Sequence, residues 1–195
     1  MRLLRTLIFA TTSMLLMAGA FAQDPNVKHF AKDGLSFDYS NGWTIAEESN
    51  ADAQQLSVTH GDEAMIKFFV HRGRVNSPDK MAQAKSKLID PYVEFTAKQF
   101  VQMGAKPERI PASTEIGGLP AEGIRIRAVL GSESGEAAIY WNTVGERLVV
   151  STFFGPDKAR QKATATWDII RNSVKVEPPP QPKSTPQPSP AKGKP

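Results

Sequence analysis

The 195-residue sequence contains no cysteine. This absence excludes a disulfide scaffold, a thiolate zinc site, an iron–sulfur cluster, a cysteine nucleophile and a lipid-modified N-terminal cysteine. After the first 22 residues the sequence also lacks any long apolar run, so we expect no integral membrane segment in the mature chain. The length is sufficient for one domain with a sizeable core, and two ordinary domains would be cramped.

Motifs for catalysis and cofactor binding are missing as well. The sequence has no G-x-S-x-G elbow, no S-x-x-K pair and no H-E-x-x-H spacing, and Gly117-Gly118 precedes a strand without the G-K-[ST] ending of a phosphate loop. We therefore expect no enzyme, no cofactor and no metal site. The carboxylate pair of a glycosidase has no fixed spacing in sequence, so an envelope hydrolase stays an alternative.

The N-terminus is typical of a secretory signal peptide, residues 1–22. Arg2 and Arg5 precede an apolar run from Leu7 to Leu16, and Ala20-Phe21-Ala22 is a small-x-small cleavage site. We expect cleavage between Ala22 and Gln23 and a periplasmic or secreted product. A membrane anchor is the alternative, but the run is short for about 30 Å of hydrocarbon.

The C-terminus, residues 177–195, is predicted to be a disordered tail rich in proline and lysine. It holds eight of the fifteen prolines, three lysines and no apolar side chain larger than alanine. Such a segment cannot bury enough surface to offset its ordering entropy, and repeated X-Pro steps favour polyproline II. The simplest interpretation of this segment is a solvated spacer. The alternatives are a loose PxxP ligand or a weak basic tether to an anionic surface.

The net charge of +4 and the isoelectric point near 9.3 belong to these two ends. Residues 23–176 hold 19 basic and 19 acidic side chains. A formally neutral domain gives no support for a phosphate-binding groove, so no nucleic acid is expected as a partner.

Residues 29–71 alternate turn signals with short strands. Leu35, Phe37 and Tyr39 alternate with polar residues, Asn41-Gly42 is a strong turn signal, and Ile66, Phe68 and Val70 share one strand face.

The period then changes over residues 79–103, where apolar residues step by three and four, as in a helix. Ser77-Pro78-Asp79 predicts its start. Asp90-Pro91 interrupts the run and shifts its phase, so we expect a kinked helix or two abutting helices.

The second half predicts three strands and a last helix. Residues 124–130, 137–143 and 147–154 are joined by connections too short for a parallel crossover, which indicates an antiparallel meander. After Gly155-Pro156-Asp157, an apolar stripe at Ala159, Ala163, Trp167, Ile170 and Val174 predicts a helix lying on the sheet. The adjacent pairs Phe68-Phe69 and Phe153-Phe154 place rings on both sheet faces. The fold class is therefore α+β, an antiparallel sheet with helices packed on it.

Three segments resemble PsbP-like domains. The opening of these domains resembles residues 33–39 followed by Asn41-Gly42-Trp43. The entry to their second strand block resembles Gly118-Leu119-Pro120-Ala121, and their closing helix resembles residues 167–174. The resemblance spans most of residues 29–176 and implies an α/β/α sandwich. In photosynthetic members it implies an accessory role at photosystem II. The matched positions are structural, so the resemblance assigns no functional residue.

Two basic groups are candidate binding sites. His71, Arg72 and Arg74 form a basic strand end, and Arg125 and Arg127 lie on one strand face. Guanidinium groups at this spacing are suited to a carboxylate or phosphate, although pairing with acidic residues or simple exposure is the commoner outcome. We expect a non-enzymatic binding or accessory protein of the cell envelope, with an envelope protein or a small anionic ligand as partner. A small-ligand carrier with a cavity between sheet and helix is the alternative.

Overall fold

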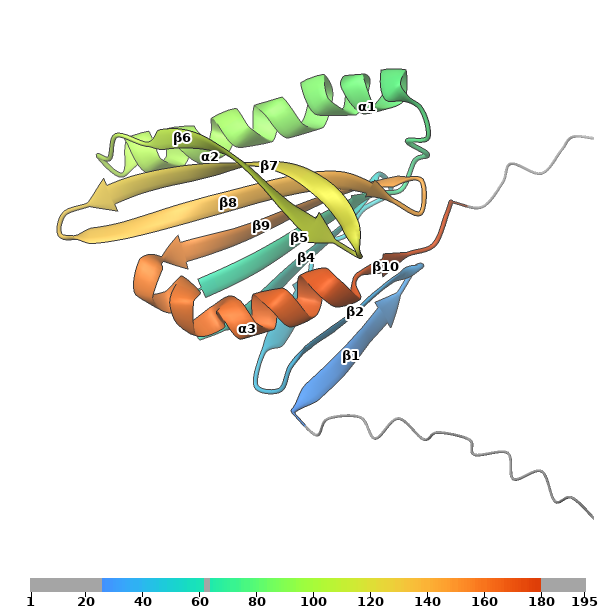
Figure 1. Ribbon diagram of the computed structural model, residues 1–195, viewed down its shortest axis with the longest axis horizontal. Helices are drawn as coiled ribbons and strands as arrows, with labels where there is room; N and C mark the ends of the chain where they lie inside the picture. Colours follow the sequence, from blue (N-terminus) through green and yellow to red (C-terminus); the bar gives the residue numbers. More distant parts are fainter. Residues whose placement is uncertain (1–25, 62–63, 180–195) are drawn as a thin grey trace, which may run out of the picture.

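A computed structural model describes residues 26–61 and 64–179 of the chain (Figure 1). The predicted signal peptide with its cleavage site at Ala22 and Gln23, and residues 180–195 of the predicted tail, lie outside the described residues.

The secondary structure follows the expected order of strands, helix, strands and helix. The strands are β1 (Val27–Lys32), β2 (Leu35–Ser40), β3 (Thr44–Glu47), β4 (Ala53–His60), β5 (Ala64–His71), β6 (Glu108–Ile116), β7 (Leu119–Leu130), β8 (Glu133–Val144), β9 (Arg147–Pro156) and β10 (Lys175–Val176). The helices are α1 (Pro78–Ala84), the π-helical segment η1 (Lys85–Ile89), α2 (Asp90–Gln102) and α3 (Asp157–Ser173). Among the described residues, none of the helices is long and apolar enough to cross a membrane.

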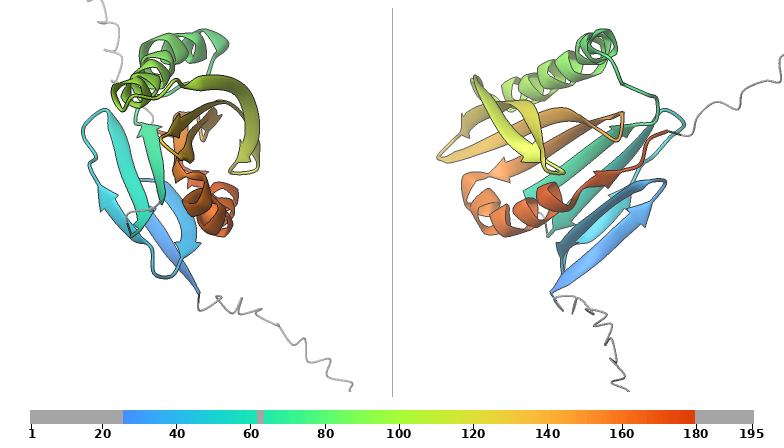
Figure 2. Two further views of the ribbon diagram at one scale, coloured as in Figure 1. Left: turned by 90° about the vertical axis from the view of Figure 1, so that its left-hand side faces the viewer. Right: turned by 45° about the vertical axis from the view of Figure 1, so that its right-hand side comes forward.

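Seven strands form one antiparallel sheet in the order β3-β4-β5-β9-β8-β7-β6. The β7–β8–β9 meander is confirmed, and β9 pairs with β5, which joins the two halves of the chain. A smaller sheet, β1-β2-β10, is also antiparallel. Helices α1 and α2 lie on one face of the large sheet, and α3 with the small sheet lies on the other (Figures 1 and 2). This three-layer arrangement confirms the α+β class and the α/β/α sandwich.

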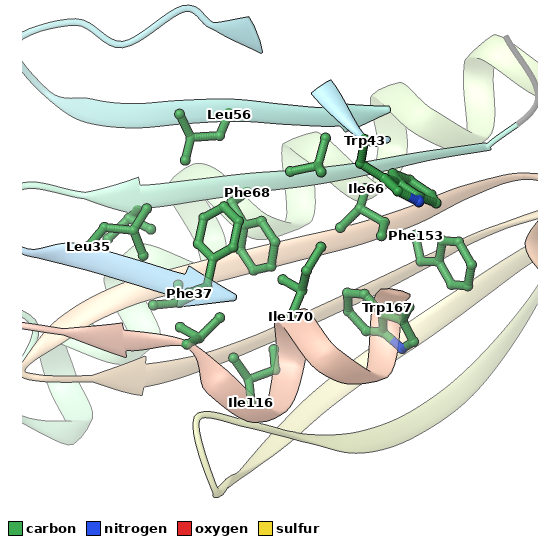
Figure 3. Close-up of a cluster of buried hydrophobic side chains, with 14 of the residues drawn as sticks. Leu35, Phe37, Trp43, Leu56, Ile66, Phe68, Ile116, Phe153, Trp167 and Ile170 are labelled. Carbon is green, nitrogen blue, oxygen red and sulfur yellow. The ribbon is translucent and has the colours of Figure 1, made fainter. Parts of the chain in front are cut away.

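The core on the α3 side is built from the predicted stripe. Ala159, Ala163, Trp167, Ile170 and Val174 are all buried against the sheet. Trp167 stacks on Phe153 at 5.5 Å between ring centroids and on Tyr140 at 6.1 Å. Figure 3 shows the side chains of Phe37, Phe68 and Ile170 meeting in this layer, so α3, β2 and the large sheet share one core.

A second core lies between α2 and the opposite face of the sheet. Ile89, Val93, Ala97 and Phe100 of the helical segment pack against Ile126, Ile139 and Val150 and their neighbours. Phe69 and Phe154 point to this side and are less buried than their neighbours Phe68 and Phe153. Rings on both faces are therefore confirmed, and the α2 side is the less completely covered one.

The predicted interruption at Asp90-Pro91 is a π-helical turn. Ser77 caps α1 by accepting from the Lys80 backbone N–H at 3.3 Å, as its position before Pro78 predicts. Pro91 has no N–H, and in an α-helix its ring would clash with the carbonyl of Lys87. The wider turn over 85–89, in which the Asp90 N–H bonds to the Lys85 carbonyl, relieves that clash and shifts the helix phase.

Strands β1, β6 and β10 go beyond the sequence prediction, which began the strand pattern at Leu35 and placed none between 104 and 117. Pro111 stands inside β6, which is tolerated because β6 is the last strand of the large sheet. The three turns Asp33-Gly34, Gly117-Gly118 and Gly145-Glu146 have positive φ at both residues, as two-residue antiparallel connections require.

Candidate functional site

The candidate site is a groove of about 320 Å³ between the helical layer and one side of the large sheet. Its floor is formed by β4, β5 and β9, and its wall by η1 and the start of α2. We call it the α2 groove and define it by Gln55, Ser57, Lys67, Phe69, Leu88 and Tyr92, with Glu48 at one edge. It exists because the sheet extends beyond the area that α1 and α2 cover.

Two rows of side chains cross the groove floor. Gln55 pairs with Phe69, and Phe69 pairs with Val150, so these three residues form one row across β4, β5 and β9. Ser57, Lys67 and Thr152 form the next row in the same way. Because strand side chains alternate, both rows face the helical layer, away from the α3 core. One row of the floor therefore combines the amide of Gln55 with two apolar side chains, and the next row is polar throughout.

The wall is set by the π-helical turn. Leu88 lies inside η1, and Tyr92 follows one turn later on the same side. The Tyr92 hydroxyl lies 3.0 Å from Thr152 Oγ1, and the Thr96 hydroxyl donates to the Tyr92 carbonyl at 2.9 Å. Burial raises the pKa of Tyr92 above its ordinary value, so this phenol is neutral at physiological pH.

The groove has few charged groups. Lys67 and Glu48 are its charged side chains, both exposed, and the remaining polar groups are hydroxyls and one amide. Its lining contains no histidine, and the hydroxyl groups of Ser57 and Thr152 are the cross-strand neighbours of Lys67. Across residues 26–61 and 64–179, no three His, Asp or Glu side chains gather as a metal site would require. The geometry suits binding of an extended or flat ligand.

The predicted basic group at 71–74 lies outside this groove lining, at one end of the sheet. The His71 ring nitrogen Nδ1 lies 3.0 Å from the Gly73 backbone nitrogen. Arg72 donates to Asp33 at 3.0 Å and to the Asn50 carbonyl at 2.9 Å. Arg74 lies 2.9 Å from a Glu146 carboxylate oxygen and donates to the Pro179 carbonyl at 2.8 Å. These side chains thus contact loops and the end of the described chain.

A further arginine at this end was missed by the sequence analysis. Arg147 is 4% exposed and donates to the His71 carbonyl at 3.0 Å, the Asp33 carbonyl at 3.2 Å and the Gln54 amide oxygen at 2.9 Å. Burial, and next to it the charge of Arg72, lower the pKa of Arg147. The residue was read as the start of an ordinary strand, since nothing in its sequence neighbourhood indicates burial.

Arg125 and Arg127 are paired with acidic residues on the α3 side. Arg125 binds Glu136 at 2.5 Å, and Arg160 of α3 lies 2.8 Å from the other oxygen of the same carboxylate. Glu136 is 1% exposed, and its hydrogen bond raises the pKa of Arg125. Arg127 binds Asp157 at 2.8 Å. The pairing alternative weighed from the sequence therefore describes both residues.

The structure does not bring the five predicted basic residues to one place. The groove residues were missed because the floor of β4 and β5 meets the wall of η1 and α2 only through the packing of the helical layer on the sheet, which no local pattern reveals. One signal was present: Lys67 interrupts the apolar run of β5 on the face opposite Ile66 and Phe68. A second was the phase shift at Asp90-Pro91, which marks the π-helical wall.

Neither a family model nor a curated protein matches the sequence. Solved structures do match. The solution structure of cyanobacterial PsbP (CyanoP) from Synechocystis sp. PCC 6803 covers 83% of this chain and 98% of its own, with a TM-score of 0.50 and 13% identity. A crystal structure from Bacteroides thetaiotaomicron covers 78% of this chain and 49% of its own, with a TM-score of 0.48 and 10% identity. At 13% identity the CyanoP match is a statement about architecture, and it agrees with the resemblance in the turns and closing helix: the chain has a PsbP-like fold.

Proposed function

We propose that this protein is a secreted or periplasmic, non-enzymatic binding or accessory protein of the cell envelope, and that the α2 groove is its contact surface. The observation that carries the proposal is the groove itself, in which the apolar side chains of Phe69 and Val150 lie beside a polar row of Ser57, Lys67 and Thr152. The accessory role implied by the sequence resemblance is in line with it.

A small-ligand carrier is the second candidate, favoured by one observation. Phe69, Tyr92 and the cationic side chain of Lys67 line the same groove, a combination of ring surface and positive charge that suits a flat anion. The volume of about 320 Å³ is at the small end of ligand cavities, so a bound molecule would be small or partly exposed.

Site-specific photocrosslinking in intact cells tests the first proposal. A benzophenone side chain is placed at Lys67 in the groove and, as a matched control, at Lys158, an exposed lysine of α3 on the other side of the sheet. We expect a partner adduct of shifted mass from position 67 and none from position 158. Equal adducts from both positions, or none from position 67, would refute the groove as contact surface.

The carrier alternative has its own probe. Anilinonaphthalene sulfonate is aromatic and anionic, and its fluorescence rises in an apolar site. Binding that is lost in Lys67→Glu and kept in Lys158→Glu supports the carrier. Binding that is insensitive to both changes counts against it.

Export and anion binding stay predictions. The mature protein is expected to begin at Gln23, and N-terminal sequencing of protein from cells checks this; an intact Met1 would contradict it. Anion binding by His71, Arg72 and Arg74, or by Arg125 and Arg127, requires that an anion displace the internal acceptors described above.

A further inference from the structure

We propose that the α2 groove is a docking surface for proline-rich segments, and that its occupant in this protein is the chain's own C-terminal segment, residues 180–195. The inference rests on the proposed function, because it takes the groove as the contact surface and adds the class of ligand and its source.

The C-terminal segment starts at a fixed point. The Glu177 N–H donates to the Gly34 carbonyl at 2.7 Å, and Arg74 donates to the Pro179 carbonyl at 2.8 Å. We call residues 176–179 the root of the segment. The turn at Gly145 packs so closely on the root that a Cβ atom at position 145 would lie 1.9 Å from the Val176 carbonyl oxygen. The last described residues are therefore held on both sides.

The root leads towards the helical layer. Val176 belongs to the core on the α3 side, whereas Arg74 lies in the connection from β5 to α1. Between Val176 and Pro179 the chain thus passes the end of the large sheet towards the start of α1, as Figure 1 and the right-hand view of Figure 2 show. Strand β5, which carries Lys67 and Phe69 of the groove floor, ends at His71, three residues before Arg74.

The segment is long enough to run along the groove. Its sixteen residues include six prolines. In polyproline II they span up to about 50 Å, while a strand of eight residues such as β5 spans about 26 Å.

The groove offers what a polyproline II ligand needs. Such a ligand leaves all its carbonyl groups free to accept hydrogen bonds and packs its proline rings on aromatic side chains. Phe69 and Tyr92 supply the rings, and Gln55, Ser57 and Lys67 supply donors in adjacent positions across β4 and β5.

Of the two charged side chains that line the groove, Glu48 is opposite in sign to the lysines of the segment, whereas Lys67 has the same sign. Residues 180–195 contain three lysines and no acidic side chain. Glu47 ends β3, and the connection to β4 carries Glu48 and Asp52; of these three residues only Glu48 lines the groove. Glu47 is bound to Lys32 at 2.7 Å, so Glu48 is the carboxylate placed to meet a lysine of the segment.

Tethering makes even a weak contact effective. An effective concentration on the order of 1 mM for the tethered segment would turn a free-peptide Kd of about 100 µM into roughly 90% occupancy within the chain.

Amide NMR spectra of two chains test the proposal: residues 23–195, and a chain that ends at Pro179 and keeps every described contact of the root. Removing residues 180–195 is expected to shift the amide signals of Gln55, Ser57, Lys67, Phe69 and Tyr92. The shifts should be independent of protein concentration, since the contact is within one chain. Shifts confined to the root, or a concentration dependence that indicates a second copy, would overturn it.

A synthetic peptide of residues 180–195, added to the chain ending at Pro179, provides the second measurement. We expect saturable binding, weakened about fivefold or more when the six prolines are replaced by alanine, since the preformed extended conformation is lost. Glu48→Lys should weaken binding of the native peptide, while the matched surface change Glu133→Lys should not. Absence of binding at millimolar peptide, or equal weakening by both variants, sinks the proposal.

The two proposals fail separately. If position 67 crosslinks to an envelope partner but the peptide does not bind, the groove remains a contact surface and its proline-rich ligand is rejected. If the peptide binds but no envelope adduct forms, the intramolecular contact stands and the partner-binding function is rejected.

Discussion

Replacing Arg147 by alanine is expected to destabilise the protein by about 3–5 kcal/mol, because it removes one partner from a buried, charged hydrogen-bond network. The guanidinium group joins the Asp33 carbonyl of the first turn, the Gln54 amide of β4 and the His71 carbonyl at the end of β5. Each acceptor left unpaired costs about 1–3 kcal/mol. Relief from burying a positive charge offsets part of that sum.

Urea unfolding, followed by tryptophan fluorescence, measures the change. Arg72→Ala is the matched control: it removes the same type of side chain at the same end of the sheet, where the Arg72 side chain is 32% exposed and binds Asp33. We expect its loss to be at most about 1 kcal/mol, as for exposed ion pairs. A decrease in the free energy of unfolding below about 1 kcal/mol for Arg147→Ala, or equal decreases for both variants, would show that the buried network of Arg147 does not stabilise the protein more than an exposed ion pair does.

A double-mutant cycle identifies the source of the effect. Gln54 is also buried, and its amide nitrogen donates to the Lys32 carbonyl at 2.9 Å while its oxygen accepts from Arg147. Gln54→Leu and Arg147→Met each leave the other residue without its hydrogen-bond partner. The double variant should therefore lose less stability than the sum of the two single losses. Simple additivity would contradict a coupled network.

Trp167→Ala should cost about 3–5 kcal/mol in the free energy of unfolding, because this 7%-exposed ring stacks on Phe153 and Tyr140; a near-zero change in the unfolding midpoint would contradict its place in the core. Ser77→Ala should cost about 1 kcal/mol through loss of the α1 cap, and Ser77→Asp should restore most of it, both by urea unfolding. The pKa of Asp157 is lowered, chiefly by the hydrogen bond from Ser134, so its contribution to stability is full above about pH 4 and is lost as the pH falls through the lowered pKa. Thermal unfolding between pH 5 and pH 2 should therefore show a smaller acid-induced decrease for Asp157→Asn than for the unmodified protein.

Local periodicity predicted the elements whose side chains repeat cleanly. The stripe of α3 repeats every three to four residues over four turns, and the strands of the meander are separated by connections that permit one pairing direction. Strand β1 has a weak pattern, because most of its side chains are exposed at the edge of a small sheet. Strand β6 contains Pro111, which counts against a strand unless the strand is known to be at an edge.

The candidate site was less predictable than the fold, for a physical reason. A row such as Gln55–Phe69–Val150 depends on the pairing of β4 with β5 and of β5 with β9, and register between distant strands follows from the packing of the whole sheet. The basic residues were visible in sequence because charge is a property of single residues. Their partners Glu136, Asp157 and Glu146 were equally visible, but nothing local assigned them.

The pairing of distant strands also determines when, during synthesis, each strand can pair with its neighbour in the sheet. Met65 in β5 pairs with Phe154 in β9, and Leu35 in β2 pairs with Val176 in β10. As the chain is synthesised, strand β5, which carries the apolar side chains of Ile66, Phe68 and Val70, lacks its neighbour β9 until residues 147–156 have been made. A large sequence separation between paired strands slows folding and lengthens the time for which aggregation-prone strands are exposed. A factor that shields β5 during this interval would act on yield, and variants that weaken β9 would first show their effect as aggregation of newly made chains.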